Sequence, residues 1–225
     1  MATPIFRWRH LTLLILLLVI LIVAPEVSLL RNGTVILNVI GVIVLLSGLY
    51  AVSERKSQFV VALVLSGLSI FGSWLVVAYP SHWVVIAAHI CATALLGFFA
   101  ITILIYVMRT GAVTGDRIFA AICAYLIIGY AWAFAYAILD ECQPGAFSTA
   151  IEIARNDYVG RVIQMRYFSF VTLATVGYGD IVPKTSAART MTILEAIFGQ
   201  FYLVALIGRL VGLHIVHGTH QTGRS

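Results

Sequence analysis

Long runs of apolar residues, separated by short polar segments, make up most of this chain. A helix that crosses a membrane needs about 20 predominantly apolar residues. Six stretches come close to or exceed that length, at roughly residues 8–24, 35–52, 59–79, 83–107, 118–139 and 187–212. The connection between the last two contains a shorter apolar stretch, 165–174, which cannot span. The pattern predicts an all-α membrane protein with six transmembrane helices and one re-entrant helix shielded from lipid by other segments.

The composition agrees with a membrane protein. Hydrophobic residues make up 61% of the chain and charged residues only 10%, whereas soluble domains are roughly 45–50% apolar. The formal net charge is +5, but the basic residues lie mostly beside the apolar stretches, where they set membrane topology. Since no Lys/Arg patch with interleaved aromatic residues occurs, we expect contact with membrane lipid and no nucleic-acid partner.

The short segments between the apolar stretches predict the orientation. Lys and Arg are enriched in cytoplasmic loops. The short loops on one side carry only Arg31, whereas the segments on the other side carry Arg7, Arg9, Arg55, Lys56, Arg109 and Arg117. Both termini are therefore expected in the cytoplasm, with the protein in a plasma membrane. The long connection 140–186 also carries basic residues, against this bias, together with acidic ones.

The connection between the fifth and sixth stretches reads TVGYGD at residues 175–180. A dehydrated cation needs oxygen ligands in place of water, and backbone carbonyls supply them when successive peptides turn toward one axis. Such a backbone alternates in handedness, and Gly177 and Gly179 can adopt positive φ because they have no Cβ. The six residues resemble the selectivity filter of potassium channels, and Pro183 and Thr185 continue the resemblance.

This resemblance implies a potassium site and an oligomer. The filter would comprise Thr175, Val176, Gly177, Tyr178 and Gly179, and K⁺ would bind the carbonyl groups of the first four. The Thr175 hydroxyl would lie at the inner end, and Tyr178 would point away from the ions. We expect K⁺ as the permeant ion, no cofactor and no transition-metal site. Because a closed ring needs four filters and the chain has one, a homotetramer with cyclic symmetry is expected.

Two positions depart from the potassium channel pattern. Ala174 stands where many of these channels have a second threonine, and Val171 stands where some have a glutamate that bonds the aspartate after GYG. Asp180 therefore needs another partner, and the hydroxyl of Tyr167 is the candidate. These departures bear on gating and inactivation of the filter rather than on its selectivity.

The aromatic residues of the short apolar stretch are candidates for packing behind the filter. Tyr167, Phe168 and Phe170 are expected to contact Tyr178, and simple apolar packing would place them in much the same way. The C-terminal carbonyls of this helix would point toward a central cavity, where their partial negative charge favours a cation.

The last apolar stretch contains unusual small and polar residues. Gly199 is either a hinge, because glycine weakens a helix by roughly 1 kcal/mol relative to alanine, or a site of close packing against the short helix. Gln200 is expected to face the cavity below the filter. The same face continues toward a cytoplasmic gate through Leu203, Leu206 and Ile207.

Glu195 is an acidic residue within an apolar stretch. It lies five positions before Gln200, so it faces away from the cavity at 3.6 residues per turn. An ionisable residue inside a membrane helix is a functional candidate. The structural alternative is support of the filter through a hydrogen bond to Thr172 or to a neighbouring helix, and the sequence leaves both open.

Six spans with a pore loop between the last two are also the plan of voltage-gated cation channels, whose fourth span carries arginines. Here no Asp, Glu, Lys or Arg occurs from Ser57 to Met108. Since one charge crossing the field contributes about 2.3 kcal/mol per 100 mV, an uncharged helix gains nothing from voltage. The first four helices are therefore not a conventional voltage sensor. We expect a packing scaffold around the pore, with a lipid- or tension-responsive role as the alternative.

These patterns divide the chain into an N-terminal membrane region, 1–110, a pore domain, 111–215, and a cytoplasmic tail, 216–225. The end of the chain carries His214, His217 and His220. Histidine titrates near pH 6.5, so protonation there could repel cations or open the gate, although a solvated terminus is the simpler interpretation. Cys142 is expected in an external loop, either as a free thiol or as a bridge between subunits.

The sequence as a whole predicts a homotetrameric, potassium-selective, passive channel of bacterial type, and not an enzyme. One alternative is a non-selective cation channel, for which an acidic residue would be expected in place of Tyr178. A potassium-uptake subunit usually carries four degenerate pore loops in one longer chain, whereas this chain has one fully spelled filter. A non-conducting regulatory membrane subunit is the third alternative.

Overall fold

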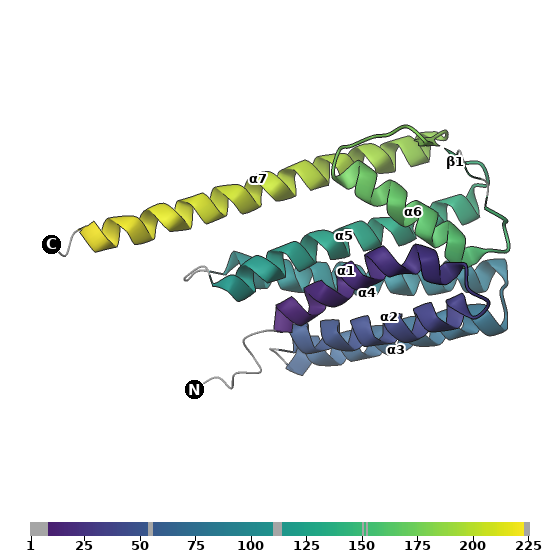
Figure 1. The fold of residues 1–225 in the computed structure, drawn as a ribbon, viewed down its shortest axis with the longest axis horizontal. Helices are drawn as coiled ribbons and strands as arrows, with labels where there is room; N and C mark the ends of the chain where they lie inside the picture. The colour runs from purple at the N-terminus through teal and green to yellow at the C-terminus, as the bar shows by residue number, and fades with distance from the viewer. Residues whose placement is uncertain (1–8, 54–55, 110–113, 150, 152, 223–225) are drawn as a thin grey trace.

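Five long helices form most of the body of the molecule (Figure 1). The computed structural model describes the backbone of residues 9–53, 56–109, 114–149, 151 and 153–222, and side chains in the last helix as far as residue 206 and again at 208 and 209. The five helices are α1 (Arg9–Ser28), α2 (Gly33–Val52), α3 (Lys56–Ala78), α4 (His82–Met108) and α5 (Gly115–Cys142). Each is long and apolar enough to cross a membrane, so this is an integral membrane protein.

The first five predicted spans coincide with these helices, and the differences lie at their ends. The helix α1 passes through Pro25 and ends at Ser28, beyond the predicted end at residue 24. Ser28 Oγ donates a hydrogen bond to the Pro25 carbonyl at 2.6 Å, which satisfies one of the acceptors left free at a helix end. The sixth predicted span, 187–212, lies within α7 (Ser186–Thr222) and stays a prediction, because the side chains of α7 are only partly described.

The helices α4 and α5 lie at the centre of the fold. The helix α4 packs against α3 and α5, and α5 also packs against α1 and α6. Their contacts are apolar, with Leu13, Leu17, Leu95, Phe99 and Ile127 all buried in one cluster. The fourth predicted span therefore serves as a packing element, which is consistent with its lack of charge.

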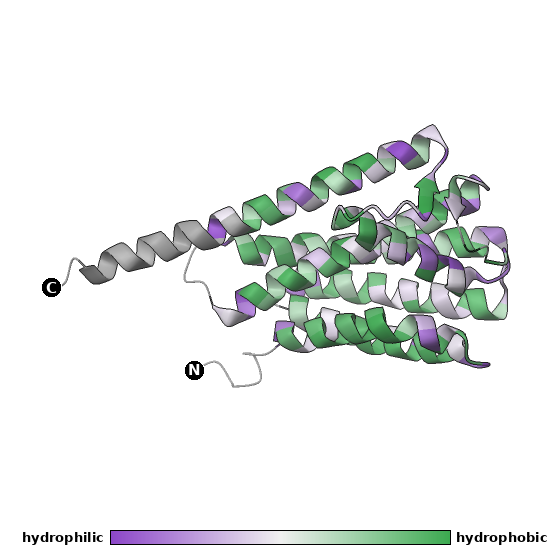
Figure 2. Cartoon of the chain, turned by 45° about the horizontal axis from the view of Figure 1, so that its top comes forward, coloured by the Kyte–Doolittle hydropathy of each residue, from purple (hydrophilic) through white to green (hydrophobic). Residues whose placement is uncertain are grey.

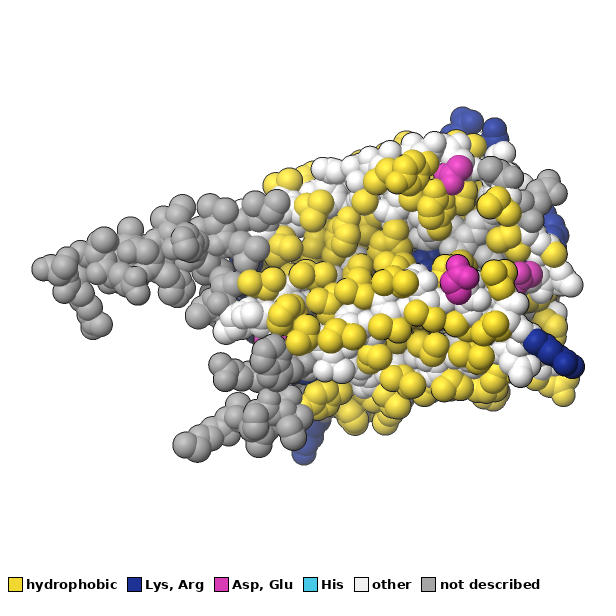
Figure 3. Space-filling model, in the orientation of Figure 1, with side chains coloured by type: hydrophobic (Ala, Val, Ile, Leu, Met, Phe, Trp, Pro, Cys, Tyr) yellow, Lys and Arg dark blue, Asp and Glu magenta, His cyan; other side chains and the backbone are white. Residues whose placement is uncertain are grey.

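The outer faces of the bundle are as apolar as its core. Exposed apolar side chains on α2, α3 and α4 include Val39, Ile43, Leu63, Phe71, Ile101 and Ile105. Figure 2 shows apolar residues along the length of these helices, and Figure 3 shows hydrophobic side chains over the visible face with charged ones near its ends. Membrane lipid would cover such a surface, whereas water would not tolerate a patch of this extent.

The predicted re-entrant helix is longer than its apolar stretch. The helix α6 spans Tyr158–Leu173 rather than 165–174. Its start is fixed by Asp157, whose side chain accepts a hydrogen bond from the Gly160 amide at 2.9 Å. Its first turns are held by Arg161, which forms ion pairs of 2.6 Å with Asp140 and with Glu141 at the end of α5. These long-range contacts stabilise a polar first half that the hydrophobic pattern does not reveal.

Two short strands, which the sequence did not predict, flank α6. The strands β1 (Phe147–Thr149) and β2 (Ile181–Pro183) pair antiparallel, with Phe147 opposite Pro183 and Thr149 opposite Ile181. They tie the end of the 175–180 segment to the segment that follows α5. The helix α7 then runs away from the bundle as a single long rod (Figure 1) and remains helical to Thr222, so the predicted tail begins as a continuation of this helix.

Candidate functional site

The backbone of residues 175–180 alternates in handedness. Thr175, Gly177 and Gly179 have φ values of 56°, 60° and 79°, and Thr175 is the one non-glycine residue with positive φ in the described part of the chain. Val176 and Tyr178 lie between them without positive φ. The two glycines behave as the sequence predicts, whereas positive φ at a β-branched threonine is uncommon and was not anticipated. An alternation of this kind is what successive carbonyl groups need in order to turn toward one axis.

Hydrogen bonds fix this segment at both ends. At its start, the Thr175 amide donates to the Thr172 carbonyl and the Val176 amide donates to the Val171 carbonyl, each at 2.9 Å. At its end, the Tyr167 hydroxyl donates to Asp180 Oδ2 at 2.6 Å. This last contact is the one that the sequence indicates for Asp180. The pair fastens the end of the segment to the middle of α6.

The segment itself lies on the surface of the single chain. Val176 is 51% exposed and Tyr178 is 70% exposed, although both are large and largely apolar. The predicted packing of Phe168 and Phe170 against Tyr178 does not occur within one chain. The Phe168 ring lies 5.1 Å from that of Tyr136, and the Phe170 ring lies 5.5 Å from that of Tyr130, so both face α5 instead.

Glu195 lies behind the segment, at the junction of α5, α6 and α7. Its side chain is completely buried and accepts hydrogen bonds from Ser169 Oγ at 2.5 Å and from the Tyr136 hydroxyl at 2.6 Å. Of the two interpretations left open by the sequence, the hydrogen bond is present. Its partners are Tyr136 of α5 and Ser169 of α6, so the predicted bond to a neighbouring helix is confirmed, whereas the bond to Thr172 is not formed. The carboxylate therefore joins three helices by polar contacts.

The helix α7 contacts the end of α6 through Gly199 and the 175–180 segment through Gln200. A Cβ on Gly199 would overlap the Leu173 carbonyl oxygen, so the two backbones are in direct contact here. Gln200 Nε2 donates to Thr175 Oγ1 at 3.2 Å and is solvent-exposed, on the side expected for a cavity. Leu203 is also exposed, Leu206 is partly buried, and the Ile207 side chain lies outside the described residues.

One face of α7 is apolar and has nothing covering it. Its exposed side chains are Ile193, Leu194, Ile197, Phe198, Phe201 and Val204. Val176 and Tyr178 of the 175–180 segment are exposed as well. A single chain therefore leaves both the 175–180 segment and the helix beside it without apolar partners.

The C-terminal half of α7 contacts the C-terminal end of α4. The guanidinium of Arg209 donates to the Met108 carbonyl at 2.9 Å and also to the Arg109 carbonyl. The side chains of His214, His217 and His220 lie outside the described residues. Among the described residues no cluster of three or more His, Cys, Asp or Glu side chains could hold a metal ion, and Cys142 is an exposed free thiol.

Comparison with known proteins gives the class of this protein. Residues 120–213, which include most of α5, all of α6, the 175–180 segment and most of α7, match the ion channel family. The potassium channel protein kcv of Paramecium bursaria Chlorella virus 1 is 36% identical over 71 residues, which cover 32% of this chain and 76% of the viral protein. The chain belongs to the potassium channel family, and this points to a channel rather than an enzyme.

Other relatives match shorter or more divergent parts. Two-pore potassium channel 4 of Arabidopsis thaliana is 51% identical over 45 residues, or 20% of this chain, but the match spans only 16% of the plant protein. Protein LctB of Bacillus caldotenax is 28% identical over 122 residues, covering 54% of this chain and 90% of LctB. The family match begins at residue 120, so α1–α4 lie outside it.

Proposed function

We propose that this chain forms a homotetrameric channel that conducts K⁺ passively and selectively across a plasma membrane. The observation that carries the proposal is the alternating backbone of residues 175–180, with positive φ at Thr175, Gly177 and Gly179. Four such segments around one axis would surround the ion with carbonyl oxygens, which replace its hydration shell. The ligands would be the carbonyl groups of Thr175, Val176, Gly177 and Tyr178.

The exposed apolar surface supports the tetramer. Tyr178 and Phe201 are each 70% exposed in the single chain, and a neighbouring copy would bury both. In a four-fold ring every copy meets its neighbours through the same two different surfaces, so the uncovered face of α7 and the 175–180 segment of one chain would lie against the neighbouring copies. Tyr178 would then find its aromatic packing across the subunit boundary.

Below the filter, the residues of α7 define an ion path. Gln200 contacts the Thr175 hydroxyl at 3.2 Å and would line a cavity at the inner end of the filter. Leu203 and Ile207 would continue this path to a gate. With both termini in the cytoplasm, as the positive residues favour, the Asp180 end of the filter faces outward.

Voltage is not the stimulus in this proposal. The segment from Ser57 to Met108, which forms α3 and α4, contains no Asp, Glu, Lys or Arg. It therefore carries no charge on which the membrane field could act. The helices α1–α4 would act as a scaffold for α5 and α6, with which α1 and α4 are in contact.

The test is ion flux through the purified protein in liposomes, with K⁺ and Na⁺ gradients measured separately and Ba²⁺ as blocker. The variant Gly177→Ala is paired with Gly67→Ala. A Cβ at either site meets nothing within 4 Å, but only Gly177 has positive φ. We expect K⁺ flux at least tenfold above Na⁺ flux, blocked by Ba²⁺, lost in Gly177→Ala and kept in Gly67→Ala.

Each alternative predicts a different result in this assay. A non-selective cation channel would pass K⁺ and Na⁺ equally, and a regulatory subunit would pass neither even at saturating protein. Equal loss of flux in both glycine variants would contradict the role assigned to the backbone of the filter. Native mass spectrometry of the same sample would contradict the tetramer if it found another subunit number.

A further inference from the structure

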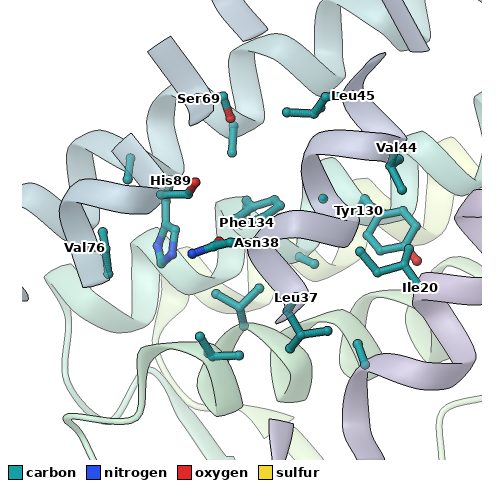
Figure 4. Close-up of a pocket in the computed structure, with 18 of the residues that line it drawn as sticks. Ile20, Leu37, Asn38, Val44, Leu45, Ser69, Val76, His89, Tyr130 and Phe134 are labelled. Carbon is teal, nitrogen blue, oxygen red and sulfur yellow. The ribbon is translucent and has the colours of Figure 1, made fainter. Parts of the chain in front are cut away.

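A cavity of about 270 Å³ lies where the first four helices meet α5 and α6. Its walls are contributed by all six of these helices and are mostly apolar. Figure 4 shows Leu37, Val44 and Leu45 of α2 around it, together with Val76 of α3 and Phe134 of α5. Ligand pockets in proteins typically have volumes of about 300–1,000 Å³ and a few polar groups in an apolar lining. This cavity is close to that range.

Two polar atoms in the wall lack hydrogen-bond partners. Asn38 Nδ2 and His89 Nδ1 are buried and have no partner among the described residues. His89 is only 9% exposed, and in Figure 4 the amide nitrogen of Asn38 points toward its imidazole ring. An unsatisfied buried polar group costs about 1–3 kcal/mol. A hydrogen-bond acceptor from a ligand, placed between the two side chains, would remove this cost. His89 can donate to it when its Nδ1 carries the proton.

A buried cation lies in the same wall. Arg166 of α6 lines the cavity and is 6% exposed. Its guanidinium donates to the Ile20 carbonyl at 3.4 Å and lies 5.8 Å from the centre of the Tyr130 ring. No ion pair with a carboxylate is found for Arg166 in the described part of the chain. Because a buried charge normally has a counter-ion, this site favours an anionic ligand group.

We propose that this cavity binds a single-chain amphiphile with an anionic head, of the kind represented by a fatty-acid carboxylate. The carboxylate would lie near Arg166, with Asn38 and His89 as hydrogen-bond donors, and the chain would lie against the apolar walls. A space of about 270 Å³ suits one short chain.

The position of the cavity gives the first four helices a role in ligand binding in addition to packing. Arg166 lies in α6, the helix that leads directly into the 175–180 segment, whereas Asn38 and His89 lie in α2 and α4. A bound amphiphile would therefore contact both the scaffold and the helix that supports the filter. The proposal concerns binding, so it does not depend on whether the protein conducts.

The experiment measures equilibrium binding of radiolabelled decanoate to the full chain in lipid nanodiscs, with empty nanodiscs as background. Gly41 lines the cavity, and a Cβ there meets nothing within 4 Å, so Gly41→Leu fills the space without a clash. The matched control is Gly67→Leu, which also meets nothing within 4 Å but does not line the cavity. We expect saturable binding of one decanoate per chain, weakened at least tenfold by Gly41→Leu and unchanged by Gly67→Leu.

The head group is tested with decanol as the uncharged competitor. We expect decanoate to bind at least tenfold more tightly than decanol, Arg166→Gln to remove that difference, and Arg166→Lys to keep most of it. Binding that does not saturate, or that is equal in the two glycine variants, would overturn the proposal, as would equal binding of decanoate and decanol. Since K⁺ flux is measured separately, absence of decanoate binding to the wild-type protein with intact flux would refute this site and leave the channel proposal standing.

Discussion

Gly199 of α7 lies directly against the Leu173 carbonyl at the end of α6, with no room between them for a side chain. Leu173 is the last residue of the helix that precedes the 175–180 segment. The α7 helix is continuous through Gly199, without a break at this point. Of the hinge and the close-packing interpretations of this glycine, the geometry supports close packing, because the helix is unbroken here and a Cβ would overlap the Leu173 carbonyl oxygen.

Gly199→Ala should therefore destabilise the protein rather than merely stiffen α7. Inserting a methyl group into a tight contact typically costs about 1–3 kcal/mol, and here it would push α7 away from the start of the filter. The control is Gly208→Ala in the same helix, where a Cβ meets nothing within 4 Å. That change should be neutral or stabilising by up to about 1 kcal/mol. Thermal unfolding of the detergent-solubilised protein measures both, and equal Tm values for the two variants would contradict the packing role.

Glu195 provides a second test of how α7 is attached. Replacing it by Leu leaves the Tyr136 hydroxyl without its acceptor, a loss that costs about 1–3 kcal/mol, whereas Ser169 Oγ keeps the Gly129 carbonyl as an acceptor at 2.8 Å. Glu195→Gln keeps one acceptor oxygen and should cost clearly less. Tyr136→Phe in the Glu195→Leu background should add less destabilisation than in the wild type, since the two side chains act as a pair. Additive losses in this double-mutant cycle, measured by unfolding, would show that the hydrogen bond contributes nothing.

The sequence predicts the membrane helices well because each depends on a continuous apolar run. It places α6 poorly because the first half of α6 is polar and is held by Arg161, whose partners Asp140 and Glu141 belong to α5. No local pattern reports such a contact. The positive φ of Thr175 is missed for a similar reason, since a threonine gives no local sign that its surroundings impose this conformation.

The polar contacts between α5, α6 and α7 show what a sequence can and cannot specify. Ser169 and Glu195 are each polar residues within otherwise apolar stretches. Since a buried polar side chain needs a hydrogen-bond partner, the sequence indicates that each of them has one. Their pairing spans 26 positions, and the bond from Tyr136 spans 59, so only the packing of three helices reveals it. The contact of Tyr167 with Asp180 could be anticipated because the expected glutamate is absent and few donors are near.

Tyr167→Phe tests that contact directly. The variant keeps the ring but removes the hydroxyl that donates to Asp180 Oδ2 at 2.6 Å. We expect K⁺ selectivity to persist, because the carbonyl groups are unchanged, while single-channel openings become several-fold shorter as the end of the filter loosens. Tyr158→Phe is the control, since its hydroxyl contacts the Pro80 carbonyl at 3.4 Å, away from the filter. Bilayer recordings with unchanged openings in Tyr167→Phe would show that Asp180 needs no such support.

Arg209 allows a test of whether the contact between α4 and the C-terminal half of α7 affects channel opening. Its guanidinium binds the Met108 and Arg109 carbonyls, which lie at the C-terminal end of α4, where a cation is also favoured by the helix dipole. Arg209→Gln removes the charge, and a loss of about 1 kcal/mol changes a two-state equilibrium roughly five-fold. We expect the ratio of open to closed channels to change by that factor, with single-channel conductance unaltered.

The matched control for Arg209 is Arg189→Gln in the same helix. Arg189 is exposed near the outer end of α7, where it donates to the Pro183 carbonyl at 3.4 Å, and it has no contact with α4 among the described residues. Its replacement should leave the open probability within error of the wild type, because surface substitutions rarely exceed about 0.5 kcal/mol. An equal shift in both variants would mean that overall charge, rather than the link between α4 and α7, sets the equilibrium. A conductance change confined to Arg209→Gln would instead place this side chain in the ion path, which the carbonyl contacts argue against.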